Sequence, residues 1–310
     1  MTAVGVDVGG SKSLGVLLDD AGTVIAEERV ATPRTADALV SMIADLVDAL
    51  RSHAPGAPVG IGVPGLVDAS GALRFVPNLP GVVEVPVRDA LLARGVHTAV
   101  IINDATAATW AEFTAGAATG ARDVVMATIG TGIGGGIVLG GVLVTGHHGF
   151  AGEIGHMVVD PTGPRCPCGQ QGCWERYASG SGLGWMAREA AHAGAARRVV
   201  ELAGGDPEAV RGEHVTVAAA EGDAEAVAVM DRFAWWLALG LANLAAVLDP
   251  DVIVLGGGMV EAGEVLLGPA RRAFATLLEG GRHRPPVRLV AASLGERAGA
   301  IGAALLARGA

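Results

Sequence analysis

The chain has 310 residues, of which 51% are hydrophobic and 48 are glycine, and its formal net charge is -10. This much apolar surface excludes a disordered chain, and the acidic balance leaves no basic footprint for nucleic acid. One stretch, from Val124 to Gly152, has no Asp, Glu, Lys or Arg and is long enough to cross a bilayer. Its many glycines and its two histidines are not typical of a lipid-facing helix, so we expect no membrane partner and no nucleic acid.

The periodicity of the apolar residues in the first third of the chain predicts strands and helices joined by Gly, Pro and Asp turns. The predicted elements are strands 4–8, 13–18 and 24–30, helix 36–53, strand 59–63, helix 87–94, strand 98–102 and a helix from 104 to 113. The amino terminus has no basic region and carries Asp7 in its apolar run, so we expect no secretory signal and a cytoplasmic chain.

The charge-free stretch has the same order of strands and turns as the amino terminus. Its apolar segments are 124–129, 137–139 and 142–145, and they indicate a second copy of the three-stranded meander. The rest predicts helices through 181–220, a core helix at 224–248, strands 252–255 and 287–291, and a last helix from 296. We expect two lobes, 1–117 and 118–296, with the terminal helix 297–310 packing back on the first.

The first glycine turn follows a strand that ends near Asp7. Gly9 and Gly10 let backbone amides approach a phosphate, and a carboxylate beside them can hold Mg²⁺ directly or through water. Ser11 and Lys12 complete the motif, and Lys12 is the only lysine of the chain. An ordinary Gly-Gly hairpin is the alternative, and the spacing of a Walker A loop is absent.

A second glycine run lies between two apolar strands of the second meander. It extends from Gly130 to Gly136 and contains Gly130, Thr131, Gly132, Gly134 and Gly135. Each interior glycine costs roughly 0.5–1 kcal/mol relative to Ala, so packing alone is a poor explanation for the run. A strand follows it where a Rossmann site has a helix, so we predict a phosphate loop facing the first one.

Asn103 and Asp104 stand where a strand ends and a helix begins. Asp is a good N-cap residue, which is the structural alternative here. The functional interpretation is a carboxylate that accepts the proton of a substrate hydroxyl as that hydroxyl attacks a phosphoryl group.

A Cys-x-Cys-x4-Cys run with an upstream histidine is the sharpest local signal. His156, Cys166, Cys168 and Cys173 supply four soft or borderline donors, enough for a closed tetrahedral structural zinc site. The neighbouring pair His147–His148 offers rival fourth ligands, and reduced thiols without metal are the other alternative. Glu153 and Glu175 flank the cluster, either as solvated charges or as functional carboxylates.

Together these motifs resemble the ROK family of sugar kinases and related repressors, and within it the bacterial glucokinases. The resemblance also covers the loop from Pro77 to Gly81, the run Gly152-Glu-Ile-Gly-His156, and Asp249-Pro250 leading to Gly256, Gly257 and Gly258. It implies an α/β fold, the duplicated actin-like, ribonuclease H-like ATPase architecture with two lobes and an interdomain cleft. ATP with Mg²⁺ and the sugar would bind in that cleft.

The resemblance implies ATP-dependent phosphorylation of glucose at its 6-hydroxyl, with Asp104 as the base. The residues it assigns to the sugar are Gly65, Asn78, Asn103, Asp104, Glu153, His156 and Glu175, and His156 would also bind zinc. The glycine turns and the Gly256–Gly258 run would hold the nucleotide phosphates. A homodimer or homotetramer is also expected.

The chain departs from the family pattern at Ile102, where many members have Glu, and at Val82, where a Trp is common. Neither position carries phosphoryl chemistry, but both leave sugar selectivity open. The alternatives are mannose, fructose, N-acetylglucosamine or N-acetylmannosamine as acceptor, and polyphosphate as donor. A sugar-responsive regulator is a remote alternative, because the first strand begins by Val4 and leaves no room for a preceding DNA-binding module.

Overall fold

The computed structural model describes residues 1–76, 81–97 and 99–309, and it is a mixed α/β fold, as the sequence predicts. The chain folds into two compact units. Unit 1 comprises residues 1–126, 135–152 and 292–310, and unit 2 comprises residues 127–134 and 153–291. The lobe boundary after residue 117 stays a prediction.

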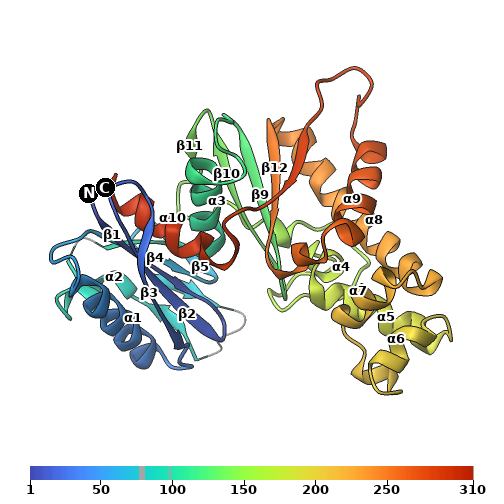
Figure 1. Ribbon diagram of the computed structural model, residues 1–310, viewed down its shortest axis with the longest axis horizontal. Helices are drawn as coiled ribbons and strands as arrows, with labels where there is room; N and C mark the ends of the chain where they lie inside the picture. Colours follow the sequence, from blue (N-terminus) through green and yellow to red (C-terminus); the bar gives the residue numbers. More distant parts are fainter. Residues whose placement is uncertain (77–80, 98, 310) are drawn as a thin grey trace. The chain divides into compact units, whose positions relative to one another are not determined.

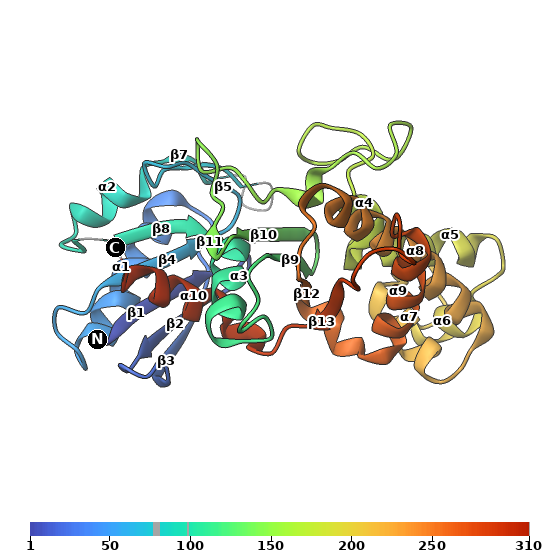
Figure 2. The same cartoon turned by 90° about the horizontal axis from the view of Figure 1, so that it is seen from above.

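The five-stranded sheet of unit 1 has the order β3-β2-β1-β4-β8 (Figure 2). Its strands are β1 (Ala3–Val8), β2 (Lys12–Leu18), β3 (Val24–Ala31), β4 (Val59–Val63) and β8 (Ala99–Asn103). The first three pair antiparallel, while β4 pairs parallel with both β1 and β8. All five residues of β4 are buried, which explains why that strand is continuously apolar.

Four helices cover this sheet, and the last of them comes from the end of the chain. α1 (Ala36–Arg51) packs on β1 and β2, and α2 (Val87–Leu92) packs on β8. α10 (Ala298–Ala307) packs against β1, β4 and α3 (Asp104–Ala115), as Figure 1 shows. The described chain also has a three-stranded sheet that the sequence did not predict: β5 (Leu66–Val67), β6 (Leu73–Phe75) and β7 (Val83–Val85).

The second predicted meander is present as β9 (Val124–Ile129), β10 (Ile133–Leu139) and β11 (Val142–Leu143). These strands lie in a sheet of order β11-β10-β9-β12-β13, where β12 (Val252–Gly256) and β13 (Arg288–Ala291) pair parallel. The glycine run differs from the prediction, because β10 already begins at Ile133 and includes three of its glycines. Packing explains one of them: a Cβ on Gly136 would lie 2.2 Å from Oγ1 of Thr109 on α3.

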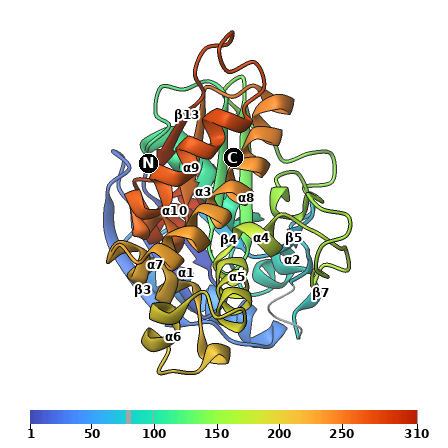
Figure 3. The ribbon, with the colours of Figure 1, turned by 90° about the vertical axis from the view of Figure 1, so that its right-hand side faces the viewer.

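Unit 2 is mostly helical, and its longest helix is α8. The helices are α4 (Glu175–Ala178), α5 (Gly180–His192), α6 (Arg197–Leu202), α7 (Gly212–Ala220), α8 (Ala224–Leu248) and α9 (Glu264–Leu277). Short 3-10 turns occur at Ile154–His156, Pro207–Ala209 and Gly258–Ala262, and at Gly295–Arg297 in unit 1. α8 packs against α9, α7 and α5 (Figure 3).

Among the described residues, α8 is the one helix whose length and composition would allow it to span a membrane. Within this fold, 56% of its most apolar window is buried, which is how the core helix of a folded unit behaves.

Candidate active site

Two aspartates converge at the carboxyl ends of β1 and β8, the two strands on either side of β4 in unit 1. Asp7 on β1 is the register partner of Gly62 on β4, and β8 next to β4 leads directly into Asp104 at the start of α3. A Cβ on Gly62 would lie 3.3 Å from Cα of Asp104 and 3.6 Å from Oδ1 of Asp7. A glycine therefore separates the two acidic residues, and no side chain stands between them at that point.

Asn103, and not Asp104, caps helix α3. The Asn103 side-chain oxygen accepts a hydrogen bond from Thr106 N at 3.0 Å, and its amide Nδ2 donates to the Gly65 carbonyl at 3.1 Å. The N-cap interpretation of Asp104 is therefore wrong, since the preceding residue fills that role. Asn103 also brings Gly65, a predicted sugar contact, to the same place. Asn78, the other predicted sugar residue of this unit, lies outside the described residues.

The electrostatics at Asp7 are unusual. Its Oδ1 is buried and has no hydrogen-bond partner among the described residues. Burial, and secondly the neighbouring Asp104 carboxylate, raise the pKa of Asp7 to about 8. An orphaned carboxylate oxygen beside a second acid is chemically suited to a hard divalent cation, which would supply the missing partner and offset the charge.

The first glycine turn is held by its own backbone and by Thr32. Gly9 N donates to Lys12 O at 3.1 Å, and Thr32 Oγ1 donates to Gly9 O at 2.7 Å. A Cβ on Gly9 would lie 2.5 Å from Lys12 O, whereas Gly10 has nothing within 4 Å of that position. Gly9 is thus required by the turn itself, while the space at Gly10 is open and leaves the backbone accessible to a ligand.

The second glycine turn lines a cavity of about 870 Å³ within unit 2. Three predicted nucleotide residues are on its wall: Gly130, Thr131 and Gly258. Gly257 lies next to Gly258, directly after β12, and has φ 82°. A Cβ on Gly257 would lie 2.4 Å from Ile129 O, so the glycine is obligatory.

Sequence reasoning missed the rest of this wall. It comes from α5, α7 and the 3-10 turn Gly258–Ala262. At the starts of the two helices glycines pack closely: Gly180 N donates to Gly130 O at 2.8 Å, and a Cβ on Gly184 would lie 3.3 Å from Gly212 N. The remaining lining residues are Ser181, Arg188, Arg211, Glu213, Thr216, Val217, Met259, Glu261 and Ala262. The sequence Ser179-Gly-Ser-Gly182, small residues at a helix start, was the available signal.

The predicted metal ligands of unit 2 come together. The ligand atoms of His156, Cys166, Cys168 and Cys173 all lie within 4.8 Å of one another. Cys168 and Cys173 have their sulfurs 3.6 Å apart, and His156 Nδ1 is 3.8 Å from Cys166 Sγ. Three thiols and an imidazole at this spacing can hold a metal ion, and the cluster contains His156 and neither rival histidine.

Both flanking glutamates reach the same histidine. The Glu153 carboxylate lies 3.8 Å from His156 Nε2, while the Cys166 sulfur lies near Nδ1, and burial raises the pKa of Glu153. Glu175 Oε1 lies 3.9 Å from His156 Nδ1 and accepts a hydrogen bond from the Cys166 thiol at 3.1 Å. Glu175 Oε2 accepts from Ile133 N at 3.4 Å, which links the cluster to the second glycine turn.

Trp174, directly after the cysteine run, anchors the metal loop to α8. Its side chain is fully buried, and Nε1 donates to Trp236 O at 2.8 Å. A Cβ on Gly240 of α8 would lie 2.1 Å from the indole ring, so this glycine makes room for the tryptophan. The apolar character of α8 hid this role from the sequence analysis.

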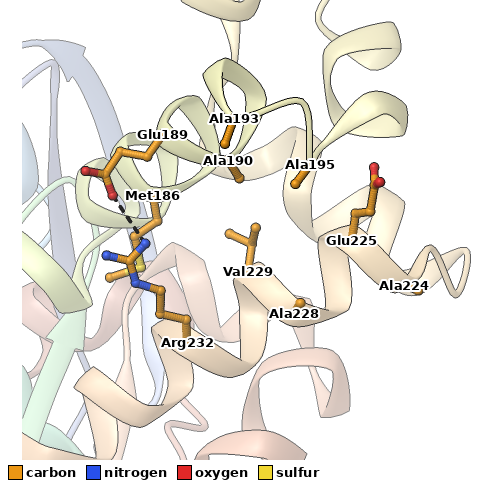
Figure 4. Close-up of a pocket in the computed structure, with 10 residues that line it drawn as sticks. All are labelled: Met186, Glu189, Ala190, Ala193, Ala195, Ala224, Glu225, Ala228, Val229 and Arg232. Atoms are coloured by element: carbon orange, nitrogen blue, oxygen red, sulfur yellow. Dashed lines mark hydrogen bonds and ion pairs between the residues drawn. The ribbon is translucent and has the colours of Figure 1, made fainter.

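A second cavity of unit 2, about 500 Å³, lies between α5 and the start of α8 (Figure 4). Half of its lining residues are alanine, and the Glu189 and Arg232 side chains on its wall pair with each other at 3.2 Å. It contains none of the predicted site residues.

The fold and the site define an α/β protein with paired acidic residues, two glycine turns and a His/Cys cluster. The sequence matches the ROK family over residues 3–310. It is 41% identical over 308 residues to a glucokinase of Streptomyces coelicolor, covering 98% of this chain and 97% of that protein. An N-acetylmannosamine kinase of Escherichia coli is 36% identical, covering 100% of this chain and 99% of that protein.

Among solved structures, a ROK family glucokinase from Streptomyces griseus, in complex with glucose and AMPPNP, is 40% identical with a TM-score of 0.88. That alignment covers 100% of both chains. The chain therefore belongs to the ROK family, and the expected architecture, that of the ROK sugar kinases, is confirmed.

Proposed function

We propose that this chain is an ATP-dependent glucokinase, which transfers the terminal phosphoryl group of ATP to the 6-hydroxyl of glucose. The observation that carries the proposal is the convergence of Asp7 and Asp104 at the ends of β1 and β8, on either side of β4, in a chain similar along its length to glucokinases. The S. griseus relative binds glucose and AMPPNP, which supports the same pair of ligands here.

Asp104 is the proposed general base. As the glucose 6-oxygen attacks the terminal phosphorus, its proton passes to the Asp104 carboxylate and then to solvent, while the bond from phosphorus to the ADP oxygen breaks. Asn103 caps α3 and so spares Asp104 from that task, and the hydrogen bond from Asn103 to Gly65 orders the loop on which the sugar would lie.

Magnesium is the second proposed component, and the residues present fit it. Asp7 would hold it, directly or through water, since its buried Oδ1 lacks a hydrogen-bond partner among the residues described. When bound, the ion supplies positive charge that offsets the charge developing on the phosphoryl oxygens. Backbone amides at the open turn of Gly10, and at Gly130 to Gly132, would act on the same oxygens.

The nucleotide base and ribose would occupy the 870 Å³ cavity of unit 2, whose wall carries Thr131 and Gly258. Thr216→Met on α7 places bulk in this cavity, so the KM for ATP should rise about tenfold or more while the Kd for glucose is unchanged. Ala220→Met, on the same helix but away from the cavity, is the control and should leave both constants unchanged. Equal effects of the two substitutions would exclude this location for the nucleotide.

Zinc is the proposed occupant of the His/Cys cluster, because three thiolates and an imidazole match its preferred donors. His156 would offer Nδ1 to the metal side and Nε2 to the side of Glu153, where the sugar hydroxyls would bind. The metal then fixes the tautomer and orientation of the histidine that contacts sugar. Glu153 and Glu175 are the proposed partners of further hydroxyls.

The decisive experiment is a panel of hexoses and amino sugars with ATP, ADP and polyphosphate, compared by kcat/KM. Glucose with ATP should give the largest value. A higher value with N-acetylmannosamine would overturn the assignment of glucose, and the 36% identical relative makes this the leading second candidate. A homodimer or homotetramer and a cytoplasmic location remain predictions, and light scattering on the purified protein tests the first.

A further inference from the structure

Helix α10 is packed into unit 1 at unusually short range, and glycines make this packing feasible. A Cβ on Gly5 of β1 would lie 1.9 Å from Ala300 O, and one on Gly60 of β4 would lie 1.8 Å from Ala303 O. These glycines let the backbone of α10 contact β1, which carries Asp7, and β4, which pairs with the strand that leads into Asp104. The last helix of the chain is therefore fixed directly against the acidic pair.

Gly299, in the first turn of α10, differs from Gly5 and Gly60, because its neighbour is a side chain and not a backbone oxygen. A Cβ there would lie 2.6 Å from Cγ of Asp7, 2.7 Å from Oδ2 and 2.8 Å from Oδ1. All three carboxyl atoms of Asp7 thus rest against the bare Cα of Gly299. The residue has ordinary helical geometry, so its conformation does not demand glycine, and only the contact with Asp7 does.

Gly62 closes the arrangement from the neighbouring strand. Its missing side chain leaves the space between Asp7 and Asp104 open. The Asp7 carboxyl group therefore has Gly299 on one side. On the other side it has the open space at Gly62, which faces Asp104. A methyl group at position 299 would force the carboxyl group to move.

We propose that Gly299 is a positioning residue, whose bare Cα holds the Asp7 carboxylate at the distance from Asp104 that the metal and phosphate require. The inference deepens the proposed function and rests on it, since it assigns α10, the last helix of the chain, to the metal end of the phosphoryl-transfer site. Gly299 itself touches no reacting atom and acts through Asp7.

The test compares Gly299→Ala with one matched control. Gly15→Ala on β2 creates a similar overlap, because its Cβ would lie 2.8 Å from a Leu50 side-chain carbon, but it meets no carboxylate. For each variant, calorimetry in saturating glucose measures the affinity for AMPPNP with and without Mg²⁺, and steady-state kinetics measures kcat and both KM values.

In the wild type, Mg²⁺ should strengthen AMPPNP binding, and in Gly299→Ala this enhancement should fall at least tenfold, with kcat reduced by a similar factor and the KM for glucose unchanged. Gly15→Ala should keep the enhancement even if its melting temperature falls. If Gly299→Ala keeps it too, or if both variants lose it equally, the positioning role is refuted.

A readout without substrates separates this inference from the proposed function. Carboxyl ¹³C NMR of the ligand-free protein, with the Asp7 signal assigned through Asp7→Asn, should show that signal displaced in Gly299→Ala and unchanged in Gly15→Ala. If no sugar were phosphorylated by the wild type, the glucokinase assignment would fail, while this spectrum would still decide whether Gly299 positions Asp7.

Discussion

The carboxylate pair of unit 1 joins residues from distant parts of the chain, whereas the His/Cys cluster of unit 2 comes from one short loop. Asp7 and Asp104 meet because β1, β4 and β8 are parallel neighbours whose carboxyl ends lie at one edge of the sheet. His156 and the three cysteines meet because few residues separate them and Trp174 anchors the loop.

The two regions also differ in how they affect the stability of the fold. The acidic pair is destabilising in the absence of a cation, as the raised pKa of Asp7 indicates, and close glycine contacts hold it in place. The cluster of unit 2 consists of donors that a metal would stabilise, and that stabilisation would act on folding itself. The acidic pair therefore keeps unfavourable charge that a bound cation would offset, and the His/Cys cluster would gain order from a bound metal.

Asp104→Asn should reduce kcat more than any other change in the two regions, because it removes the proposed base and leaves a side chain of the same shape. We expect kcat to fall about 10²–10⁴-fold, with the Kd for glucose and the melting temperature little changed. Rapid-quench kinetics with ATP and glucose measures the loss. A variant with near wild-type kcat would show that another group takes the proton.

Asp7→Asn should be next, with kcat reduced about 10²-fold through loss of the metal-holding carboxylate. It should also change stability. The folded-state pKa of about 8 lies above the usual 3.8, so the folded protein keeps a proton that the unfolded chain has released between these values. Stability of the wild type therefore falls as pH rises through this window, and the variant escapes that loss.

Thermal melts of metal-free protein at pH 5 and pH 9 test this second effect. Asp7→Asn should melt at a higher temperature than wild type at pH 9, and the difference should shrink at pH 5. Asp45→Asn, on the exposed side of α1, is the control and should show no such trend. A variant less stable than wild type at pH 9 would contradict the raised pKa of Asp7.

Removal of zinc by a chelator should act on unit 2 instead. We expect the affinity for glucose to fall about 10–100-fold and the melting temperature to drop, because His156 loses its fixed orientation. Elemental analysis before and after treatment measures the metal, and calorimetry measures the sugar. In Cys168→Ser the chelator should have little further effect. Unchanged stability and sugar binding after zinc loss would exclude the pocket-shaping role.

The smallest effect is expected outside both regions. Glu189 and Arg232 form an ion pair at 3.2 Å beside the alanine-lined cavity, with side chains 45% and 51% exposed. Such a pair contributes about 0–1 kcal/mol, so Arg232→Met should change the free energy of unfolding by no more than that and leave kcat/KM unchanged. A larger loss of activity would mean that this cavity takes part in the reaction.

The sequence predicted the strands of the two five-stranded sheets, the two meanders and the clustering of the metal ligands well, because each depends on local patterns, but it missed the sheet of β5, β6 and β7. The apolar runs of β1 and β4 are buried on both faces, and the cysteine spacing leaves little choice of ligand. It failed at Gly136, which was assigned to a loop but lies in β10, because only the packed Thr109 explains that glycine. Asn103 as the cap was equally hidden, since both it and Asp104 suit that position.

The amino-acid sequence by itself determined the donors, the glycine turns and the order of the elements, because these follow from residue type and short spacing. Only the tertiary structure decided that Asp7 lies against Gly299, that Gly62 separates it from Asp104, and that α5 and α7 complete the cavity at Thr131. Such contacts join segments that are distant in the chain, and their distances depend on how closely backbones approach. Local periodicity carries no information about that approach.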